Sequence, residues 1–98
     1  MHTDVHILWI VSFEWDPEKA RTNAQKHGVE FADAVAALED EDAINQADED
    51  SADEERFVAV GRDAFGRILV VVYTWRGENI RLISARRATR RERATYED

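Results

Sequence analysis

The sequence predicts a small soluble α+β domain, and three observations support this fold class. Apolar residues recur at helical spacing in the first part of the chain, up to residue 38. From residue 56 onward, β-branched and aromatic runs are interrupted by glycine, which is typical of successive β-hairpins. A chain of 98 residues is long enough to bury one core. We therefore expect residues 1–98 to form a single domain in which helices pack against a sheet.

The composition narrows the kinds of site that the domain can hold. Cysteine is absent, so disulfides and thiolate metal sites are excluded, and a cytoplasmic location is expected. The three histidines, His2, His6 and His27, do not have the spacing of metal ligands, so we expect neither a metal nor another cofactor. The apolar run from Ile7 to Phe13 is too short to cross a membrane and is better interpreted as a buried strand.

The first part of the chain should form a strand followed by a helix. We expect the strand from His6 to Phe13. Asp16 stands directly before Pro17, which predicts a helix start because the carboxylate can accept hydrogen bonds from free amides and proline fits the first turn. The helix should run from Pro17 to Lys26 and stop at Gly28 in a left-handed conformation. Its inward face should hold Ala20, Ala24 and His27.

A second helix and an acidic segment should follow. Phe31, Ala34, Val35 and Leu38 lie at helical spacing, which predicts an amphipathic helix of about two to three turns that packs on the sheet. Residues 39–55 contain one large apolar residue and many acidic ones, so we expect a mobile loop there.

Three strands should follow the acidic segment. The aliphatic residues of Ile68 to Val72 do not alternate with polar ones, so the strand that contains them should be central and covered on both faces. The predicted strands are Arg56 to Gly61, Arg67 to Trp75 and Asn79 to Ala85, with turns at Asp63 to Gly66 and at Arg76 to Glu78.

The last helix should begin with a capping box formed by Thr89 and Glu92, and it should run from Arg90 to about Glu97. Arg90 and Arg91 then place two positive charges in the first turn, where the helix dipole favours anions. A bound phosphate would relieve this conflict, because helix starts bind anions. Pairing with Glu92 or with the acidic segment is the other interpretation, and the sequence leaves both open.

The charges are unevenly distributed along the chain. The formal net charge is -8, but residues 39–55 hold ten acidic residues and no basic one. Residues 56–98 hold ten arginines and five acidic residues, and none of their basic residues is lysine. The guanidinium group matches phosphate oxygens with two parallel hydrogen bonds, so this half of the chain can bind phosphate. A merely solvated surface is the alternative.

The sequence resembles a known family, the BrnT toxins. The N-terminal part of the likeness includes Phe13, Glu14, Trp15, Asp16, Lys19, Ala20, Asn23, Lys26, His27, Gly28, Val29 and Phe31. The C-terminal part includes Arg56, Gly61, Gly66, Arg67, Tyr73, Arg76, Arg81, Ile83, Ser84, Ala85, Arg86, Glu92, Arg93, Tyr96 and Glu97. The likeness covers residues 13–97, although Glu30 stands where the family would have a better helix cap.

This resemblance implies a RelE-like fold, in which a four-stranded antiparallel sheet packs against two N-terminal helices and a C-terminal helix follows. It also implies a type II toxin that cleaves RNA without a metal and thereby inhibits translation. The implied partner is a BrnA-like antitoxin with a ribbon-helix-helix part, so that contact with DNA would be indirect.

Metal-independent RNA cleavage needs a base for the 2′-hydroxyl, a donor for the leaving 5′-oxygen and positive charge for the phosphorane. Histidine exchanges protons near neutral pH, so His27 is the candidate for proton transfer, with Lys26 beside it as charge or alternative acid. Arg86 and Tyr96 resemble a catalytic arginine and a later tyrosine of the RelE-like group. Antiparallel pairing should bring Arg67 near Arg86. These five residues form the predicted catalytic set.

A second set is expected to bind RNA, and each of its members has a structural alternative. Tyr73 could stack on a base, although core packing is the favoured interpretation. For any single arginine the alternative is an ordinary surface or antitoxin contact, and for His27 it is a helix cap. The predicted RNA-binding residues are Arg76, Arg81, Arg90, Arg91 and Tyr73.

A competing function uses the same arginines without catalysis. In that case the protein is a binding module whose basic face holds an acidic protein segment or a structured RNA. Cleavage of purified RNA would separate the two functions.

Overall fold

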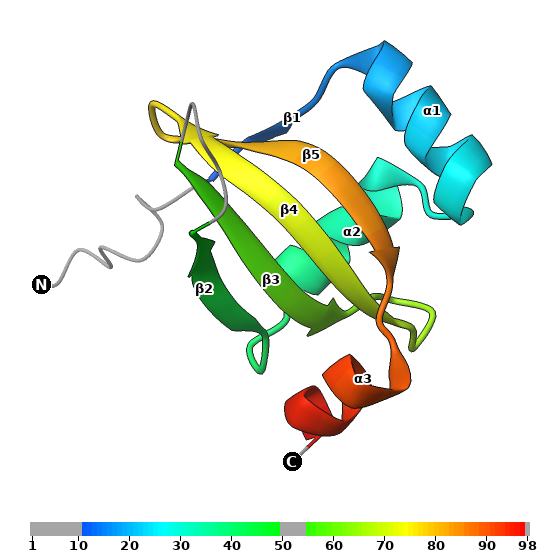
Figure 1. Cartoon of the computed structure of the whole chain (residues 1–98). Helices are drawn as coiled ribbons and strands as arrows, with labels where there is room; N and C mark the ends of the chain where they lie inside the picture. The colour runs from blue at the N-terminus through cyan, green and yellow to red at the C-terminus, as the bar shows by residue number, and fades with distance from the viewer. Residues whose placement is uncertain (1–10, 50–54, 98) are drawn as a thin grey trace, which may run out of the picture.

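The computed structural model describes residues 11–49 and 55–97, which form three helices and a five-stranded mixed sheet (Figure 1). The predicted α+β class is confirmed. The strands lie in the order β1-β5-β4-β3-β2; β1 is parallel to β5, and the other neighbouring strands are antiparallel. The elements are β1 (Phe13–Glu14), α1 (Pro17–His27), α2 (Phe31–Leu38), β2 (Ile44–Asp48), β3 (Arg56–Arg62), β4 (Ile68–Arg76), β5 (Asn79–Arg87) and α3 (Arg90–Glu97).

The expected four-stranded antiparallel sheet is wrong on two points. First, the acidic segment contains a strand, β2, which pairs with β3 from Ile44 opposite Val60 to Asp48 opposite Arg56. β2 is an edge strand with mostly exposed side chains, so it lacks the apolar alternation that reveals a half-buried strand. Second, β1 pairs with β5 in parallel. Within the described residues this first strand is limited to Phe13–Glu14, and most of the predicted strand from residue 6 lies outside them.

Helix α1 begins and ends at the predicted signals. The Asp16 carboxylate accepts a hydrogen bond of 2.9 Å from the backbone N–H of Glu18, and Gly28 ends the helix with a φ of 69°. The inward face includes a residue that the sequence did not indicate, Asn23, which is 6 % exposed. Its side chain exchanges two hydrogen bonds with the backbone of Ala85 on β5 and donates a third to the carbonyl of Val29. Asn23 therefore ties α1 to the edge of β5, beyond the short pairing with β1.

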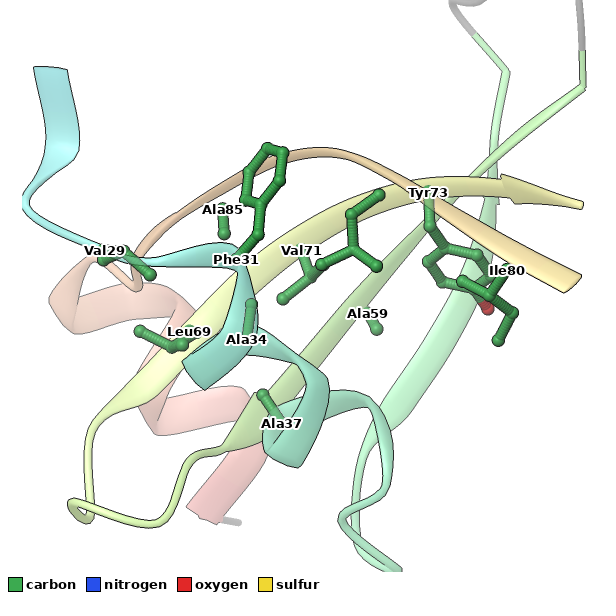
Figure 2. Packing of buried hydrophobic residues seen from close by; sticks show 11 residues of the cluster. Val29, Phe31, Ala34, Ala37, Ala59, Leu69, Val71, Tyr73, Ile80 and Ala85 are labelled. Atoms are coloured by element: carbon green, nitrogen blue, oxygen red, sulfur yellow. The ribbon is translucent and has the colours of Figure 1, made fainter. Parts of the chain in front are cut away.

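Helix α2 covers one face of the sheet and forms most of the helical part of the core (Figure 2). Phe31, Ala34 and Ala37 are buried, and their contacts on the sheet side include Leu69 and Val71 of β4. The helix comes so close to β3 that a Cβ at Gly61 would collide with the backbone carbonyl of Ala37. The side chain of Glu30 makes no capping hydrogen bond, so packing rather than a cap holds this helix.

The prediction that the aliphatic strand is central is confirmed. β4 is the middle strand of the five, and its residues from Ile68 to Val71 are buried. The predicted capping box of α3 is also confirmed, since the backbone N–H of Thr89 donates to Glu92 and that of Glu92 donates to the Thr89 hydroxyl. In the described part of the chain, no helix is long and apolar enough to cross a membrane.

Candidate functional site

The strand register places several arginines on the sheet face opposite α2. Leu69, Val71 and Tyr73 of β4 point toward α2, so the alternate residues of β4 and their partners point the other way. Arg86 is opposite Val70 on this second face. By the same register, Arg56, Arg62, Arg76 and Arg81 also lie on it.

Arg86 is held by a carboxylate from the last helix. Its two terminal nitrogens donate to the two oxygens of Glu92 at 2.8 and 2.9 Å. The hydrogen bonds from Arg86 lower the pKa of Glu92 to about 2, and the same pairing raises the pKa of Arg86. Glu92 is therefore ionised at neutral pH and is a poor proton acceptor. Its role is to orient Arg86 and to cap α3.

Five arginines surround a pocket of about 470 Å³ between α3, the end of β5 and the β3–β4 turn. We call it the α3 pocket. Arg67 was expected to converge with Arg86, with Arg90 and Arg91 nearby; Arg67 and Arg90 line this pocket, whereas Arg86 and Arg91 do not. Its lining residues are Arg62, Gly66, Arg67, Ile68, Arg87, Ala88, Arg90, Arg93, Ala94 and Glu97.

Arg67 has a structural role at this pocket. Its Nε donates to the buried carboxylate of Asp63 at 2.8 Å, and a terminal nitrogen lies 3.7 Å from Asp33 of α2. The other oxygen of Asp63 accepts from the backbone N–H groups of Phe65 and Arg67, which shapes the predicted turn. Arg67 thus fixes the β3–β4 turn to α2, and only a fifth of its side chain is exposed.

A second pocket, of about 290 Å³, lies between α1 and β5, and we call it the α1 pocket. Two predicted catalytic residues, Lys26 and His27, line it beside Ser84 of β5. Lys26 and His27 stand in the last turn of α1, and the Asn23 bonds bring that turn against β5. The full lining is Glu18, Lys19, Thr22, Asn23, Lys26, His27, Ile83 and Ser84.

Tyr96 lies away from the α1 pocket. Its hydroxyl donates a short hydrogen bond to Asp40, and Arg62 lies over its ring at 5.7 Å from the centroid. The bond raises the pKa of Tyr96 and lowers the pKa of Asp40. Asp40 also accepts from the backbone N–H of Arg62 at 2.7 Å. Tyr96 therefore docks α3 against β3 and the segment after α2.

The remaining predicted residues lie at the other end of the sheet or in its core. Arg76 and Arg81 are at the end opposite Arg86, as the predicted pairing required, and Arg81 forms a 2.8 Å ion pair with Glu14. Tyr73 is 6 % exposed, stacks on Phe57 at 5.6 Å and donates its hydroxyl hydrogen bond to Asn45. Its ring is part of the core, which is the interpretation that the sequence favoured, and it offers no face to a base.

Sequence reasoning missed several residues of these sites. Arg93 was not predicted as a site residue, although it lies three residues after the predicted Arg90 and so shares its helix face, a spacing that could have indicated their joint role. Arg87 comes directly before that helix and could have been added to them. Asn23 and Asp40 gave no local signal, because both act on backbone or side chains that are distant in the sequence.

The fold and its two basic pockets define a small α+β protein whose exposed cations suit an anionic ligand. A family model described as "Ribonuclease toxin, BrnT, of type II toxin-antitoxin system" matches residues 15–92. The chain therefore belongs to the BrnT toxin family, which confirms the resemblance seen in its sequence. This membership implies an RNA target and an antitoxin partner.

A solved structure agrees with this assignment. The chain resembles the crystal structure of the Brucella abortus ribonuclease toxin BrnT, with 28% sequence identity and a TM-score of 0.62. The similarity covers 83% of this chain and 100% of the Brucella chain. A search of curated proteins gave no match.

Proposed function

We propose that this protein is a metal-independent endoribonuclease that cleaves RNA through the 2′-hydroxyl and so inhibits translation. The observation that carries the proposal is the arrangement along β5. Ser84 lies in the α1 pocket with Lys26 and His27, and Arg86 follows two residues later on the same sheet face. Two strand residues span about 6.6 Å, so Arg86 can reach a phosphate held at the mouth of that pocket.

The proposed chemistry assigns one task to each group. His27 takes the proton of the 2′-hydroxyl, whose oxygen attacks phosphorus. The bond from phosphorus to the 5′-oxygen breaks, and Lys26 gives that oxygen a proton. The products are a 2′,3′-cyclic phosphate and a 5′-hydroxyl. Arg86 stabilises the negative charge of the phosphorane, and Glu92 holds the guanidinium in place for this purpose.

Arg67 and Tyr96 have no part in this proposed chemistry, because both are committed to structural contacts. The proposed fold group is RelE-like, because Arg86 lies near the end of the last strand, close to the position of a catalytic arginine in that group. The proposed partner that neutralises the toxin is a BrnA-like antitoxin with a ribbon-helix-helix part, and contact with DNA would pass through it.

The test is cleavage of RNA by the purified protein in the presence of EDTA. We expect products with 2′,3′-cyclic phosphate ends, and a loss of rate on the order of a hundredfold or more for Arg86→Ala and for His27→Ala. An RNA with a 2′-deoxy sugar at the cleaved position should resist. Arg21→Ala is the matched charge control, because Arg21 is an exposed arginine that pairs only with Glu18 among the described residues.

Each result has a distinct meaning. Full activity of Arg86→Ala would remove Arg86 from the mechanism. Cleavage that requires added Mg²⁺ would contradict the metal-independent route. If the protein binds RNA but does not cleave it, the competing function, a non-catalytic binding module, would be supported instead of an enzyme.

A further inference from the structure

The α3 pocket contains arginine side chains that form no ion pair within the described residues. Arg87, Arg90 and Arg93 line it, and no hydrogen bond or ion pair from their side chains occurs within residues 11–49 and 55–97. The acidic lining residue is Glu97. Three guanidinium groups around one pocket repel each other unless an anion lies between them. The alternative interpretation, a pairing of Arg90 with Glu92, does not occur, because Glu92 binds Arg86.

An exposed aromatic ring stands beside this pocket. Phe65 is 72 % exposed, more than any other large hydrophobic residue that the structure describes. It precedes Gly66 and Arg67, which line the pocket, and the Arg67 guanidinium lies 5.4 Å from the centre of its ring. The hydrogen bond from the backbone N–H of Phe65 to Asp63 fixes the backbone at this position. An exposed ring next to a cationic pocket is suited to stack on a base of single-stranded RNA.

The two pockets adjoin one strand. Ile83 and Ser84 of β5 line the α1 pocket, and Arg87 at the end of the same strand lines the α3 pocket. Arg86 lies between them in the strand. An RNA strand with its reacting phosphate at Arg86 can therefore extend into the α3 pocket.

We propose that the α3 pocket is a second RNA subsite, in which Arg87, Arg90 and Arg93 bind a non-reacting phosphate and Phe65 stacks on the adjoining base. This inference rests on the proposed ribonuclease function, because it concerns the same substrate. The volume of about 470 Å³ is within the range of small-ligand pockets and is large enough for a nucleotide unit.

RNA suits the pocket better than an acidic protein segment does. The guanidinium forks can bind either the phosphates of RNA or the carboxylates of a protein, but the exposed ring adds a preference for a flat aromatic base. Both pockets are also lined by residues of β5, so one RNA strand can reach both.

The experiment measures binding without cleavage. A fluorescent single-stranded RNA with every 2′-hydroxyl methylated is titrated with the full chain, and anisotropy gives the affinity at several salt concentrations. For Arg87→Ala/Arg90→Ala/Arg93→Ala we expect an affinity loss of about tenfold or more, and a salt slope reduced by about 0.7 for each phosphate that the variant no longer binds. Phe65→Ala should weaken binding about fivefold or more, with the salt slope unchanged.

Two matched variants separate the pocket from general electrostatics. Arg91→Ala removes the same charge from the same helix outside the pocket, so its loss of affinity should be clearly smaller than that of Arg90→Ala. Glu97→Gln should tighten binding, by roughly fivefold or less, because it removes the acidic group from the lining. Circular dichroism melts check that each variant folds, and the single variants Arg90→Ala and Arg93→Ala replace the triple variant if it does not.

Equal affinities for the Arg90→Ala and Arg91→Ala variants would overturn the proposal. So would unchanged RNA binding by the triple variant together with lost binding of a polyglutamate peptide, which would identify an acidic-protein site. Methylated RNA cannot be cleaved through its 2′-oxygen, so this assay gives its result whether or not the protein is a nuclease.

Discussion

α2 and α3 have eight residues each, yet different forces hold them to the sheet. α2 buries Phe31, Ala34 and Ala37 against the strands, makes no side-chain cap and belongs to the core. α3 has no buried residue and is attached through polar side chains. Its contacts are the Arg86–Glu92 pair, the Tyr96–Asp40 hydrogen bond and the approach of Arg62 to the Tyr96 ring.

The fold and the proposed RNA subsite at α3 therefore depend on different kinds of contact. Burial of apolar surface stabilises the whole domain, whereas a few partly exposed polar contacts stabilise only the segment they hold. Four of the ten residues that line the α3 pocket belong to α3, so the pocket is complete only while α3 is docked. A change in the α2 contact should therefore unfold the domain, and a change in the α3 contacts should act on RNA binding first.

The largest expected effect is at the centre of the α2 contact. Phe31 is 1 % exposed and its ring meets Trp15 edge to face at 6.0 Å. Phe31→Ala should lower the free energy of unfolding by about 3–5 kcal/mol, because it leaves a cavity between helix and sheet. Urea denaturation followed by circular dichroism measures this loss. A loss below about 1 kcal/mol would show that α2 is not held by its buried ring.

The next effect tests the close approach of α2 to β3. Gly61→Ala places a methyl group against the carbonyl of Ala37 and should cost about 1–3 kcal/mol in unfolding free energy. The control is Gly28→Ala, where no atom lies near the added methyl group and the cost comes from the left-handed backbone alone, about 1 kcal/mol. If Gly61→Ala is as stable as the parent chain, α2 can move away from β3 without a loss of unfolding free energy.

The same contrast explains how far the sequence predicts the fold. α1 and α3 begin at signals that lie within a few residues, namely Asp16 with Pro17 and Thr89 with Glu92, and both were found. β2 has no such signal. Its side chains are exposed and polar, and it is a strand because its backbone pairs with β3, a partner distant in the sequence.

The candidate site, like the fold, combines residues with local signals and contacts between segments that are distant in the sequence. Lys26 and His27 are neighbours in the chain and were predicted together, but their pocket needs Ser84, which only the packing of α1 on β5 brings near. Tyr96 was predicted from a family likeness, and its bond to Asp40 joins segments that are distant in the sequence. Local spacing predicts which residues carry charge, whereas the folded chain decides which of these charges are already paired.

A smaller effect, dependent on pH, is expected from the first polar contact of α3. The pKa of Glu92 falls from 4.5 to about 2 because Arg86 binds its ionised form. Its stabilising contribution is therefore complete above about pH 4.5 and is lost as the pH falls toward 2. The contribution is about 1 kcal/mol, because the pair is partly exposed. Glu92→Gln should lower the docking free energy of α3 by this amount at neutral pH.

The same variant should cost less than half as much at about pH 2, where Glu92 of the parent chain is about half protonated. Glutamine keeps the capping geometry, so the difference between variant and parent isolates the charge. Hydrogen exchange of the α3 backbone amides in both proteins at several pH values measures it, because the pair stabilises the docked helix. A difference that does not change with pH would mean that the Arg86–Glu92 pair contributes no charge-dependent stability.

The smallest effect should come from the second polar contact, and it should be local. Tyr96→Phe removes the hydroxyl that binds Asp40 and keeps the ring beneath Arg62, at a cost of about 0.5–1 kcal/mol. Because α3 has no buried residue, this loss should loosen the helix without unfolding the sheet. Trypsin should therefore cut at the α3 arginines a few times faster, while the urea midpoint stays close to that of the parent chain. Thr95→Ala removes a neighbouring hydroxyl whose hydrogen bond, within the part of the chain that the structure describes, is to the carbonyl of Arg91 in the same helix, so it should leave the cutting rate nearly unchanged. A fall in the urea midpoint of Tyr96→Phe that accounts for the full loss of about 0.5–1 kcal/mol would mean that α3 belongs to the same cooperative unit as α2, and that the RNA subsite cannot open separately from the fold.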